Sequence, residues 1–499
     1  MAAASGVLDV LGFAGFGFYP LTWIAKVPVL FAIRDVAPRH AFFLGLLYGT
    51  TGHLGGYYWM AGTLREFAGL NAVLSALLVA AGAAFLGLIC ALLMFFVRMA
   101  GRDLGIAPVW VLTVVYPVME WVFPNILPYR IGASQYPFLW VTQVVDITGL
   151  LGLTCLIGMV NGAFFELIES RWEQRRPLLS RWVVPLGVML LVLAYGAIRI
   201  KQIDAEVAKA PTKVFGLVQG NHSVEVKIDR KYEAILRYRE MTHELIVARP
   251  EVDLVVWPES ALHSDARHLQ YLGRLLQPKR PMITGVKVRD EEGRNFNAMF
   301  ALSEEGGILG RFDKTRLVPF SETIPFSDLL PVLGKLRPGE SLTEPGNIYR
   351  NLKIGDTTLM PMICYEDILP HFMREMWHRA GPPGVLVNVT DDSWFGNSPQ
   401  PVIHLALSSF RAIESRRALV RSTATGVSAV VDPVGRIVTR TEQWRAATLV
   451  SRVPVSAPGD TTFYLRFGDW LGWLLLAMTL TGLLACRHAR RRKEKISGI

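Results

Sequence analysis

Cysteine is scarce in this chain: there are four in 499 residues. Cys90, Cys155 and Cys486 lie in or at the edge of long apolar runs, which leaves Cys364 as the only cysteine in a polar region. The polar region therefore cannot contain a disulfide framework. A single cysteine in such a place is either an inert buried side chain or a nucleophile, and its neighbours decide between the two.

Several catalytic motifs are also missing. The sequence has no G-x-S-x-G, which excludes the nucleophile elbow of serine hydrolases. It has no H-E-x-x-H, no C-x-x-C and no glycine-rich phosphate loop, which argues against a zinc site and against a phosphate-loop nucleotide site. His222 and His404 are available for a Cys–His pair, but neither lies in a recognisable catalytic setting.

Charge is also low. Charged residues make up 19% of the chain and hydrophobic residues 51%, and the mean hydropathy is +0.31. The apolar excess is concentrated in the first 200 residues and near the end, which predicts an integral membrane protein with one soluble domain. Residues 1–6 contain no basic residue before the first apolar run, so we expect the first span to be retained rather than cleaved as a signal peptide.

The formal net charge of +10 does not indicate nucleic acid as a partner, because the basic residues cluster where short loops meet apolar spans. Eight apolar segments are candidates to cross a bilayer. They are 7–20, 21–36, 41–60, 70–98, 106–123, 143–166, 182–199 and 468–486. Pro20 interrupts the first two, so one re-entrant hairpin is an alternative, with six or seven spans in total.

Basic loops follow the second, fourth, sixth and eighth spans, so they share one side of the membrane, and this side should be cytoplasmic. We therefore predict a transmembrane domain of about seven helices at 1–200. The soluble domain at 201–466 then faces the periplasm of a bacterial inner membrane. A C-terminal transmembrane helix and a basic cytoplasmic tail occupy 467–499.

The soluble region alternates short β-branched runs with amphipathic segments, which predicts an α/β layered domain. The predicted strands are 214–218, 253–257, 281–288, 298–302, 357–363, 385–389 and 428–431. The predicted helices are 231–248, 370–379 and 402–417.

Three polar residues come at or near the ends of such strands. Glu259 follows the run 253–257, Lys314 follows Arg311-Phe312-Asp313, and Cys364 follows 359–363. A thiol is mostly protonated at neutral pH and needs a base, a role that suits Glu259. An ammonium such as that of Lys314 favours the thiolate and stabilises an oxyanion, and the backbone N–H of Tyr365 is a second donor. The set predicts acyl transfer through a thioester.

These residues and their neighbours resemble the nitrilase superfamily and, within it, the membrane-embedded apolipoprotein N-acyltransferase family. The resemblance extends over nearly the whole chain. The segments that carry it are 217–221, 257–260, 314–322, 363–366, 390–396 and 411–417, with 132–136 and 143–149 in the membrane half.

The resemblance implies an αββα sandwich fold for the soluble domain and a catalytic triad of Glu259, Lys314 and Cys364. It also implies supporting roles for the residues that follow two of these: Glu322 would hold the lysine, and Tyr365 and Glu366 would complete the cysteine motif. Trp394 and Phe395 would belong to a loop that gates the site. The chain departs from the family at Ile228, where a tryptophan is usual, which puts the handling of the lipid donor in doubt.

The resemblance further implies a reaction and its partners. A phospholipid donor, typically phosphatidylethanolamine, would lose an acyl chain to the cysteine. The acceptor would be the N-terminal amine of an S-diacylglyceryl-cysteine apolipoprotein, and no cofactor would be needed. The apolar, proline-rich stretch 317–333 is a candidate lipid-contacting wall or an ordinary packed loop.

Two other interpretations remain open at this level. One is a membrane-tethered amidase or nitrilase that uses the same triad on small amides with water as acceptor. The other is a non-catalytic membrane transporter or sensor with a ligand-binding domain, since Glu120 and Asp146 lie within or beside predicted spans and intramembrane carboxylates are usually functional.

Overall fold

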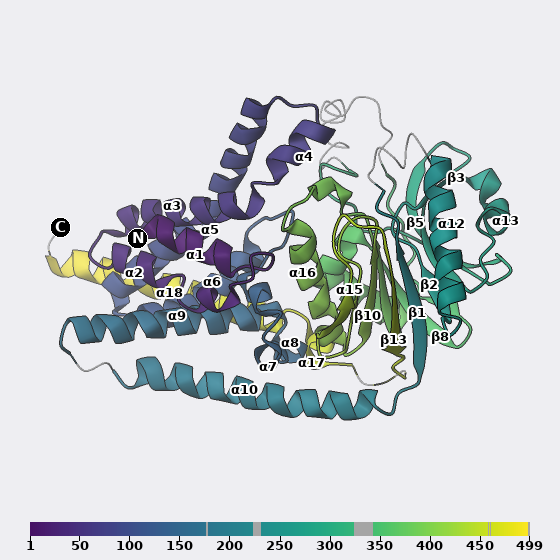
Figure 1. Ribbon diagram of the computed structural model, residues 1–499. Coiled ribbons are helices and arrows are strands. Elements are labelled where there is room, and N and C mark those ends of the chain that lie inside the picture. The colour runs from purple at the N-terminus through teal and green to yellow at the C-terminus, as the bar shows by residue number, and fades with distance from the viewer. Residues whose placement is uncertain (176–177, 223–230, 324–342, 458, 460, 498–499) are drawn as a thin grey trace. The chain divides into compact units, whose positions relative to one another are not determined.

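The computed structural model describes residues 1–499 except 176–177, 223–230, 324–342, 458, 460 and 498–499. Ile228 and the larger part of the predicted lipid-contacting wall lie outside the described residues. The chain forms two compact units (Figure 1). The helical unit comprises Met1–Ile200, Ser398–Ala406 and Arg466–Ile499, and the α/β unit comprises Lys201–Asn397 and Leu407–Leu465.

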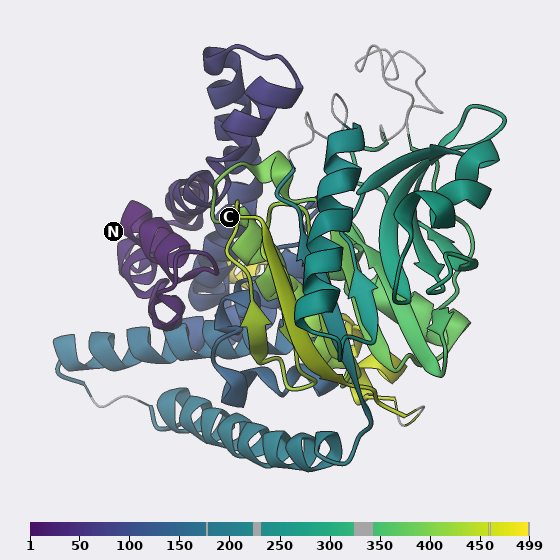
Figure 2. The same cartoon turned by 45° about the vertical axis from the view of Figure 1, so that its right-hand side comes forward.

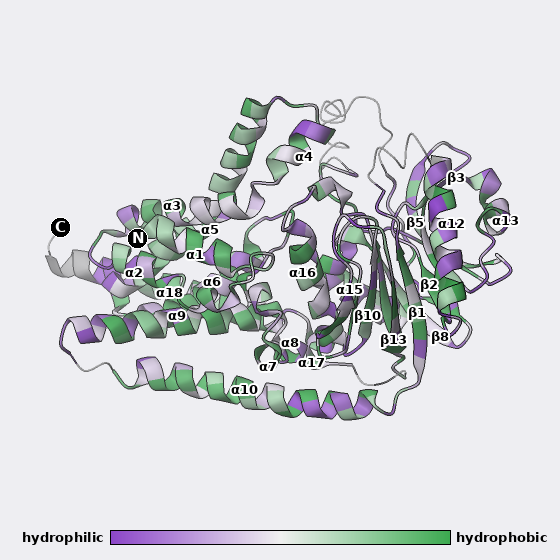
Figure 3. Ribbon diagram, viewed as in Figure 1, coloured by the Kyte–Doolittle hydropathy of each residue, from purple (hydrophilic) through white to green (hydrophobic). Residues whose placement is uncertain are grey.

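The helical unit is built from apolar helices of very different lengths. Its α-helices are α1 (Ala2–Gly12), α2 (Val27–Ile33), α3 (Pro38–Tyr57), α4 (Met60–Phe67), α5 (Ala72–Leu104), α6 (Pro108–Val122), α7 (Leu139–Thr142), α8 (Val145–Thr148), α9 (Leu150–Trp172), α10 (Ser180–Val207) and α18 (Trp470–Ser497). Two 3-10 helices, η1 (Tyr19–Trp23) and η2 (Ile131–Gln135), interrupt them. Figure 3 shows that apolar residues dominate α5, α9 and the first part of α10.

Four helices in the described residues are long and apolar enough to cross a membrane: α5, α9, α10 and, over Trp470–Arg492, α18. The segments Ala2–Gly12, Tyr19–Ile33 and Pro108–Val122 are apolar but shorter. The predicted span 143–166 begins later than expected, at Leu150, because Gly149 has a φ of 62° and ends α8 before α9 starts. Glycine adopts that backbone conformation without steric cost.

Close backbone contact between α3 and α5 depends on glycine. A Cβ added at Gly45 would lie 2.6 Å from the carbonyl oxygen of Cys90, and one at Gly49 would lie 2.7 Å from Gly87 Cα. Small residues at such positions let two helices in a membrane pack at short range, where dispersion forces replace the hydrophobic effect.

A buried ion pair connects the two short N-terminal helices. Lys26, which is fully buried before α2, donates to both carboxylate oxygens of Asp9 on α1, at 3.1 and 3.2 Å. Tyr48 of α3 also donates to Asp9, and the Lys26 ammonium lies 4.9 Å from the ring centre of Tyr116 on α6. The ion pair therefore holds the segment between α1 and α2 in place.

The α/β unit contains two sheets. The first has the order β13-β1-β2-β4-β5-β6, with β3 paired to β4, and the second has the order β12-β11-β10-β9-β8-β7. The strands of the first sheet are β1 (Thr212–Gln219), β2 (Leu254–Val256), β3 (Leu262–Asp265), β4 (Met282–Arg289), β5 (Asn295–Leu302), β6 (Ile308–Asp313) and β13 (Ala447–Pro454). Those of the second are β7 (Leu352–Ile354), β8 (Thr357–Ile363), β9 (Val385–Thr390), β10 (Ala418–Thr423), β11 (Ala429–Val431) and β12 (Ile437–Arg440).

Helices cover the outer faces of this pair of sheets. They are α12 (Lys231–Ala248), α13 (Leu272–Leu276), α15 (Pro370–Ala380), α16 (Gln400–Ser415, of which 400–406 belong to the helical unit) and α17 (Phe463–Phe467). Three 3-10 turns lie in the connections: η3 (Ala266–Tyr271), η4 (Cys364–Ile368) and η5 (Ser393–Phe395). Figure 1 shows α12 outside one sheet and α15 and α16 outside the other, and α12 stays against β1 in the turned view of Figure 2. The predicted αββα sandwich is confirmed.

The predicted strands of this unit are confirmed within a few residues, and the predicted helix 231–248 coincides with α12. Six strands were not predicted. They are β3, β6, β7, β10, β12 and β13. Strand β10 contains Arg421 and two hydroxyl residues, β12 alternates between partly buried and exposed positions, and β13 has only two buried positions. Their polar residues hide the apolar runs that mark a buried strand.

The Asp9–Lys26 pair gives a prediction about stability. Asp9→Asn leaves the buried ammonium without its counter-charge, which typically costs about 3 to 5 kcal/mol. We expect a clearly lower thermal unfolding midpoint in detergent for this variant. Glu173→Gln breaks the exposed Arg175–Glu173 pair and is the matched control, because such pairs contribute about 0 to 1 kcal/mol. Equal midpoints for the two variants would contradict the proposed role of the buried pair.

Candidate active site

Polar side chains meet where strands of both sheets end. Glu259 follows β2, Lys314 directly follows β6 and Cys364 directly follows β8. In α/β folds, ligand sites form at the carboxyl ends of strands, where successive loops lie side by side. The first sheet thus supplies a carboxylate and an ammonium, and the second supplies a thiol.

The Lys314 ammonium lies between two carboxylates. Its Nζ is 2.8 Å from Glu322 Oε2 and 2.9 Å from Glu322 Oε1, and 3.5 Å from Glu259 Oε1. Lys314 is 1% exposed and Glu259 5%, so little water screens these charges. The structure therefore brings three of the predicted site residues into direct contact.

The Lys314 side chain remains charged in this setting. Burial alone would lower the pKa of the Lys314 ammonium, but Glu322 and Glu259 together raise it above its ordinary value. Burial would likewise raise the pKa of Glu322, but Lys314 outweighs this effect and the pKa of that carboxyl is lowered. Lys314 is thus a fixed positive charge and not a proton acceptor.

Glu259 is held by two hydrogen bonds in addition to its ion pair. Asn297 of β5 donates from Nδ2 to Glu259 Oε1 at 2.7 Å, and the backbone N–H of Asp391 donates to Oε2 at 2.7 Å. Asn297 also donates to Glu322 Oε1 at 3.2 Å. Both carboxylates are therefore oriented by one amide group.

Close packing of backbone fixes the strand end that carries Glu259. A Cβ added at Gly285 of β4 would lie 2.5 Å from Glu259 Cα, 2.6 Å from the Pro258 carbonyl oxygen and 2.8 Å from the backbone nitrogen of Ser260. Only glycine fits at this position without moving the turn. Ser260 has a φ of 52°, which shows how sharply the chain turns after the carboxylate.

Cys364 occupies a sharp strand-to-helix turn. Its φ is 49°, a left-handed conformation that costs a non-glycine residue about 1 to 3 kcal/mol and is concentrated at functional sites. The side chain is partly exposed. Burial and the charge of Glu259 raise the pKa of the Cys364 thiol well above its ordinary value, and Lys314 opposes this shift. The resting thiol is therefore protonated and close to a base.

Glu366 ties the cysteine turn to the lysine loop. Its Oε1 accepts from the backbone N–H groups of Thr315 at 2.7 Å and Arg316 at 3.0 Å, and its Oε2 accepts from that of Ile363 at 2.9 Å. Burial raises the pKa of Glu366 to about 7, although these backbone donors favour the charged form. The side chain thus joins the segment after β6 to the end of β8.

A fully buried arginine anchors the cysteine turn through hydrogen bonds. Arg421 of β10 donates from Nη1 to Asn388 Oδ1 at 2.8 Å and to Asp367 of η4, and from Nη2 to Asp392 Oδ2 at 3.1 Å. Burial would lower the pKa of the Arg421 guanidinium, but Asp367 and Asp392 raise it. Asn388 also donates to the Cys364 carbonyl oxygen at 3.5 Å. The turn is thereby fixed to β9 and β10.

The remaining predicted site residues lie on short 3-10 turns near these strand ends. Tyr365 follows the cysteine in η4 and is half-buried, and burial raises the pKa of its phenol. Trp394 and Phe395 form η5 after β9 and are also half-buried. The structure places both on the loop that begins with Asp391, whose backbone contacts Glu259.

Sequence reasoning did not find Asn297, Arg421 or Gly285. Asn297 and Arg421 did leave a signal, because each is a strongly polar residue next to the apolar residues of a strand. A buried polar residue must be hydrogen-bonded, so such residues point to a network. The requirement for glycine at position 285 depends on a neighbouring strand end and is not visible in the sequence.

Metal ligation is not indicated by the described part of the chain. Among the residues that the structure describes, no group of three or more His, Cys, Asp or Glu side chains is placed to hold a metal ion. The chemistry that the site offers is thus that of a thiol, a carboxylate base and a fixed ammonium, which suits acyl transfer.

Both parts of the chain match families of known proteins. Residues 5–163 match the family model of the apolipoprotein N-acyltransferase N-terminal domain, and residues 216–461 match that of carbon-nitrogen hydrolase. Among solved structures, Saccharomyces cerevisiae Nit3, a member of branch 10 of the nitrilase superfamily, has 17% sequence identity and a TM-score of 0.39. That match covers 49% of this chain and 90% of Nit3.

Whole-length relatives extend this match. The apolipoprotein N-acyltransferase of Geobacter metallireducens is 33% identical over 498 residues, which cover 96% of this chain and 93% of that protein. That of Rhodopseudomonas palustris is 29% identical over 513 residues, with 96% and 93% covered. Both matches include the helical and the α/β parts together. The chain therefore belongs to the apolipoprotein N-acyltransferase family.

Proposed function

We propose that this protein transfers an acyl chain from a phospholipid to the N-terminal amine of a diacylglyceryl apolipoprotein, through a thioester on Cys364. The observation that carries the proposal is the buried contact of Lys314 with Glu259 and Glu322 next to a protonated thiol. Full-length similarity to named N-acyltransferases supports the acceptor class.

In the first step, Glu259 takes the thiol proton while the sulfur attacks the ester carbonyl carbon of the donor. The negative charge that develops on the carbonyl oxygen is stabilised by the Lys314 ammonium and by the backbone N–H of Tyr365. The carbon–oxygen ester bond then breaks. Glu259 returns the proton to the leaving alkoxide, lysophospholipid departs, and the acyl group remains on sulfur.

In the second step, the amine of the apolipoprotein attacks the thioester carbonyl. Glu259 takes a proton from the attacking nitrogen, the same donors hold the oxyanion, and the carbon–sulfur bond breaks to leave an amide. The proton on Glu259 returns to the thiolate, so the site is regenerated without a cofactor. Phosphatidylethanolamine is the proposed donor.

The membrane part has a direct role in this proposal. Both substrates keep their acyl chains in the bilayer, so an enzyme that joins them must hold its site at the lipid surface. We place the α/β unit on the periplasmic side of a bacterial inner membrane, because the basic loops of the helical unit share the opposite side. A soluble amidase would not need a domain that matches the N-acyltransferase family over residues 5–163.

Exposure to phospholipid provides the primary test. Intact-protein mass of the wild type is expected to rise by one fatty-acyl group, and hydroxylamine should remove it, since thioesters are labile to this nucleophile. Cys364→Ser, which removes the thiol, is expected to show no hydroxylamine-labile adduct and to lose transfer to an apolipoprotein peptide. An adduct of equal yield on the serine variant would sink the thioester proposal.

Alkylation of the thiol provides a second test, because the thiolate is the reactive form. Glu259 raises the pKa of Cys364 and Lys314 lowers it. In Glu259→Gln the thiol pKa should therefore fall, so the pH profile of alkylation by iodoacetamide should shift to lower pH while acyl transfer is lost. Lys314→Met should shift the profile to higher pH. Shifts in the reverse directions would contradict the assigned charges.

Glycine at position 285 provides a third test. Gly285→Ala forces the Glu259 turn to move, and a displacement of about 1 Å can cost about 100-fold in rate. We expect a loss of this order in acyl transfer together with a lower thermal unfolding midpoint, because the added Cβ would meet backbone atoms that cannot rotate away. Gly310→Ala in β6 is the control, because its Cβ would meet only the end of the Leu352 side chain, at 3.1 Å. Equal activity of the two variants would contradict the proposal that a Cβ at position 285 displaces Glu259.

A further inference from the structure

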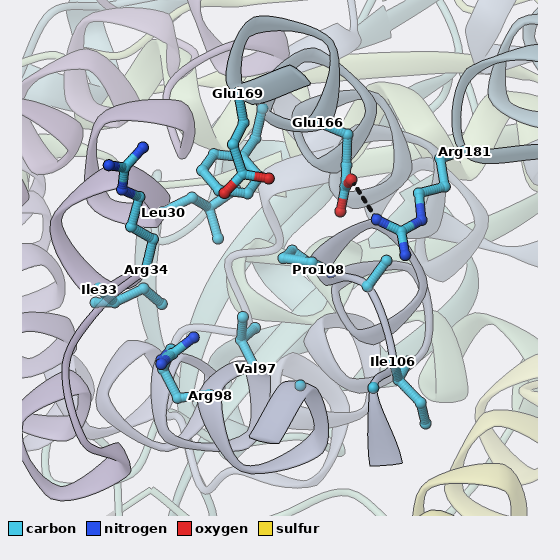
Figure 4. Close-up of a pocket in the computed structure, with 14 residues that line it drawn as sticks. Leu30, Ile33, Arg34, Val97, Arg98, Ile106, Pro108, Glu166, Glu169 and Arg181 are labelled. Carbon is cyan, nitrogen blue, oxygen red and sulfur yellow. Dashed lines mark hydrogen bonds and ion pairs between the residues drawn. The ribbon is translucent and has the colours of Figure 1, made fainter. Parts of the chain in front are cut away.

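Polar groups that the proposed reaction does not use occur at two buried places in the chain. The first is a cavity of about 190 Å³ in the helical unit (Figure 4). On its rim, Arg181 donates to Glu166 at 2.7 Å, as Figure 4 shows. Glu169, also on the rim, accepts from Arg175 at 2.6 Å, so both rim carboxylates already have a cationic partner. The second place is Thr390, the last residue of β9 in the α/β unit.

The Thr390 side chain is fully buried, and within the described part of the chain its Oγ1 makes no hydrogen bond of ordinary geometry. A buried hydroxyl without a partner costs free energy, because it has lost its hydrogen bonds to water. Valine has nearly the same shape, favours strands as strongly and would bury no polar atom. Neither packing nor strand formation therefore explains a hydroxyl at this position.

The pairing of the strands places this hydroxyl beside the cysteine turn. Strands β8 and β9 are parallel, and Ile363 pairs with Val389, so Cys364 and Thr390 come next at the same level of two neighbouring strands. Such strands lie about 4.8 Å apart. Two residues earlier on β9, Asn388 donates to the Cys364 carbonyl oxygen at 3.5 Å, so the end of β9 runs alongside the turn.

Thr390 also adjoins the segment that holds the base. The backbone N–H of the next residue, Asp391, donates to Glu259 Oε2 at 2.7 Å. The electrostatics of the thiol agree with this position. Burial and the charge of Glu259 raise the pKa of the Cys364 thiol, whereas Lys314 and the Thr390 hydroxyl, as a donor toward the sulfur, lower it.

We propose that the Thr390 hydroxyl is the hydrogen-bond donor to the Cys364 sulfur whenever that sulfur carries negative charge. A neutral thiol is a weak acceptor, which agrees with the absence of an ordinary hydrogen bond in the resting site, and a charged acceptor forms a shorter and stronger bond. The assignment rests on the proposed function, in which Cys364 is the nucleophile.

The sulfur gains negative charge twice in that reaction. It does so when Glu259 takes the thiol proton, and again when the carbon–sulfur bond of the thioester breaks and both electrons remain on sulfur. In both steps the O–H bond of Thr390 stays intact and only its hydrogen bond to sulfur strengthens. The Lys314 ammonium and the backbone N–H of Tyr365 are thereby left to stabilise the carbonyl oxygen.

Thr390→Val tests the proposal, because it removes the hydroxyl and keeps the volume. Alkylation of Cys364 by iodoacetamide, mapped by peptide mass, is followed against pH in the absence of phospholipid. Loss of a donor to the thiolate should raise the thiol pKa and shift this profile upward by about one pH unit. Acyl-enzyme formation from phospholipid should fall about tenfold. The thermal unfolding midpoint should stay equal or rise, since no unpaired hydroxyl is buried at this position any longer.

Two further variants separate the hydroxyl from packing. Thr390→Ser keeps the hydroxyl and should retain the wild-type profile. Thr284→Val, on β4 of the other sheet, removes a hydroxyl that is equally buried and likewise without a hydrogen bond among the described residues, and it should not shift the profile.

An unshifted profile in Thr390→Val overturns the proposal. An equal shift in Thr390→Ser also overturns it, because the effect would then come from packing. An upward shift confined to Thr390→Val supports the donor, even in a protein that forms no acyl adduct with phospholipid. That last combination would contradict the proposed function alone, so the two failures are distinguishable.

Discussion

The active-site region depends on one buried ammonium held between two carboxylates. Removing Lys314 and its partners from water costs several kcal/mol per ion, and only close contact with both Glu259 and Glu322 repays that cost. Burial and the excess of negative charge that remains, chiefly that of Glu259, together raise the pKa of the Cys364 thiol. In the proposed reaction, a neutral thiol of this kind would lose its proton to Glu259 as it attacks the donor carbonyl.

Two further buried groups hold the parts of this arrangement in position. Glu366 accepts hydrogen bonds from backbone on both sides of the site, so the lysine loop and the cysteine turn cannot move independently. Arg421 fixes the cysteine turn to the neighbouring strands through Asp367, Asp392 and Asn388. Each group has several hydrogen-bond partners at once, which is how a buried charge supports rather than disrupts a fold.

The sequence predicted the fold class, the strands that carry Glu259 and Cys364, and the site residues that the structure brings into contact. The two strands were found because burial of both faces of a strand leaves an unbroken apolar run, whereas the catalytic roles of the site residues remain predictions. Arg421 was not predicted, because β10 contains a charge and two hydroxyl residues in place of an unbroken apolar run. The helix boundary at Leu150 and the need for glycine at 285 follow from backbone geometry, which composition does not record.

The site takes its parts from two different sheets: Glu259, Asn297 and Lys314 from the first, and Cys364 from the second. The thiol emerges later in the chain than the other three, so a ribosome has already released the base and the cation before the nucleophile exists. A nascent domain that ends before residue 364 therefore already holds Glu259, Lys314 and Glu322 but lacks the thiol. Such an intermediate also lacks β9 to β12, so the four side chains can converge only after the second sheet has been added.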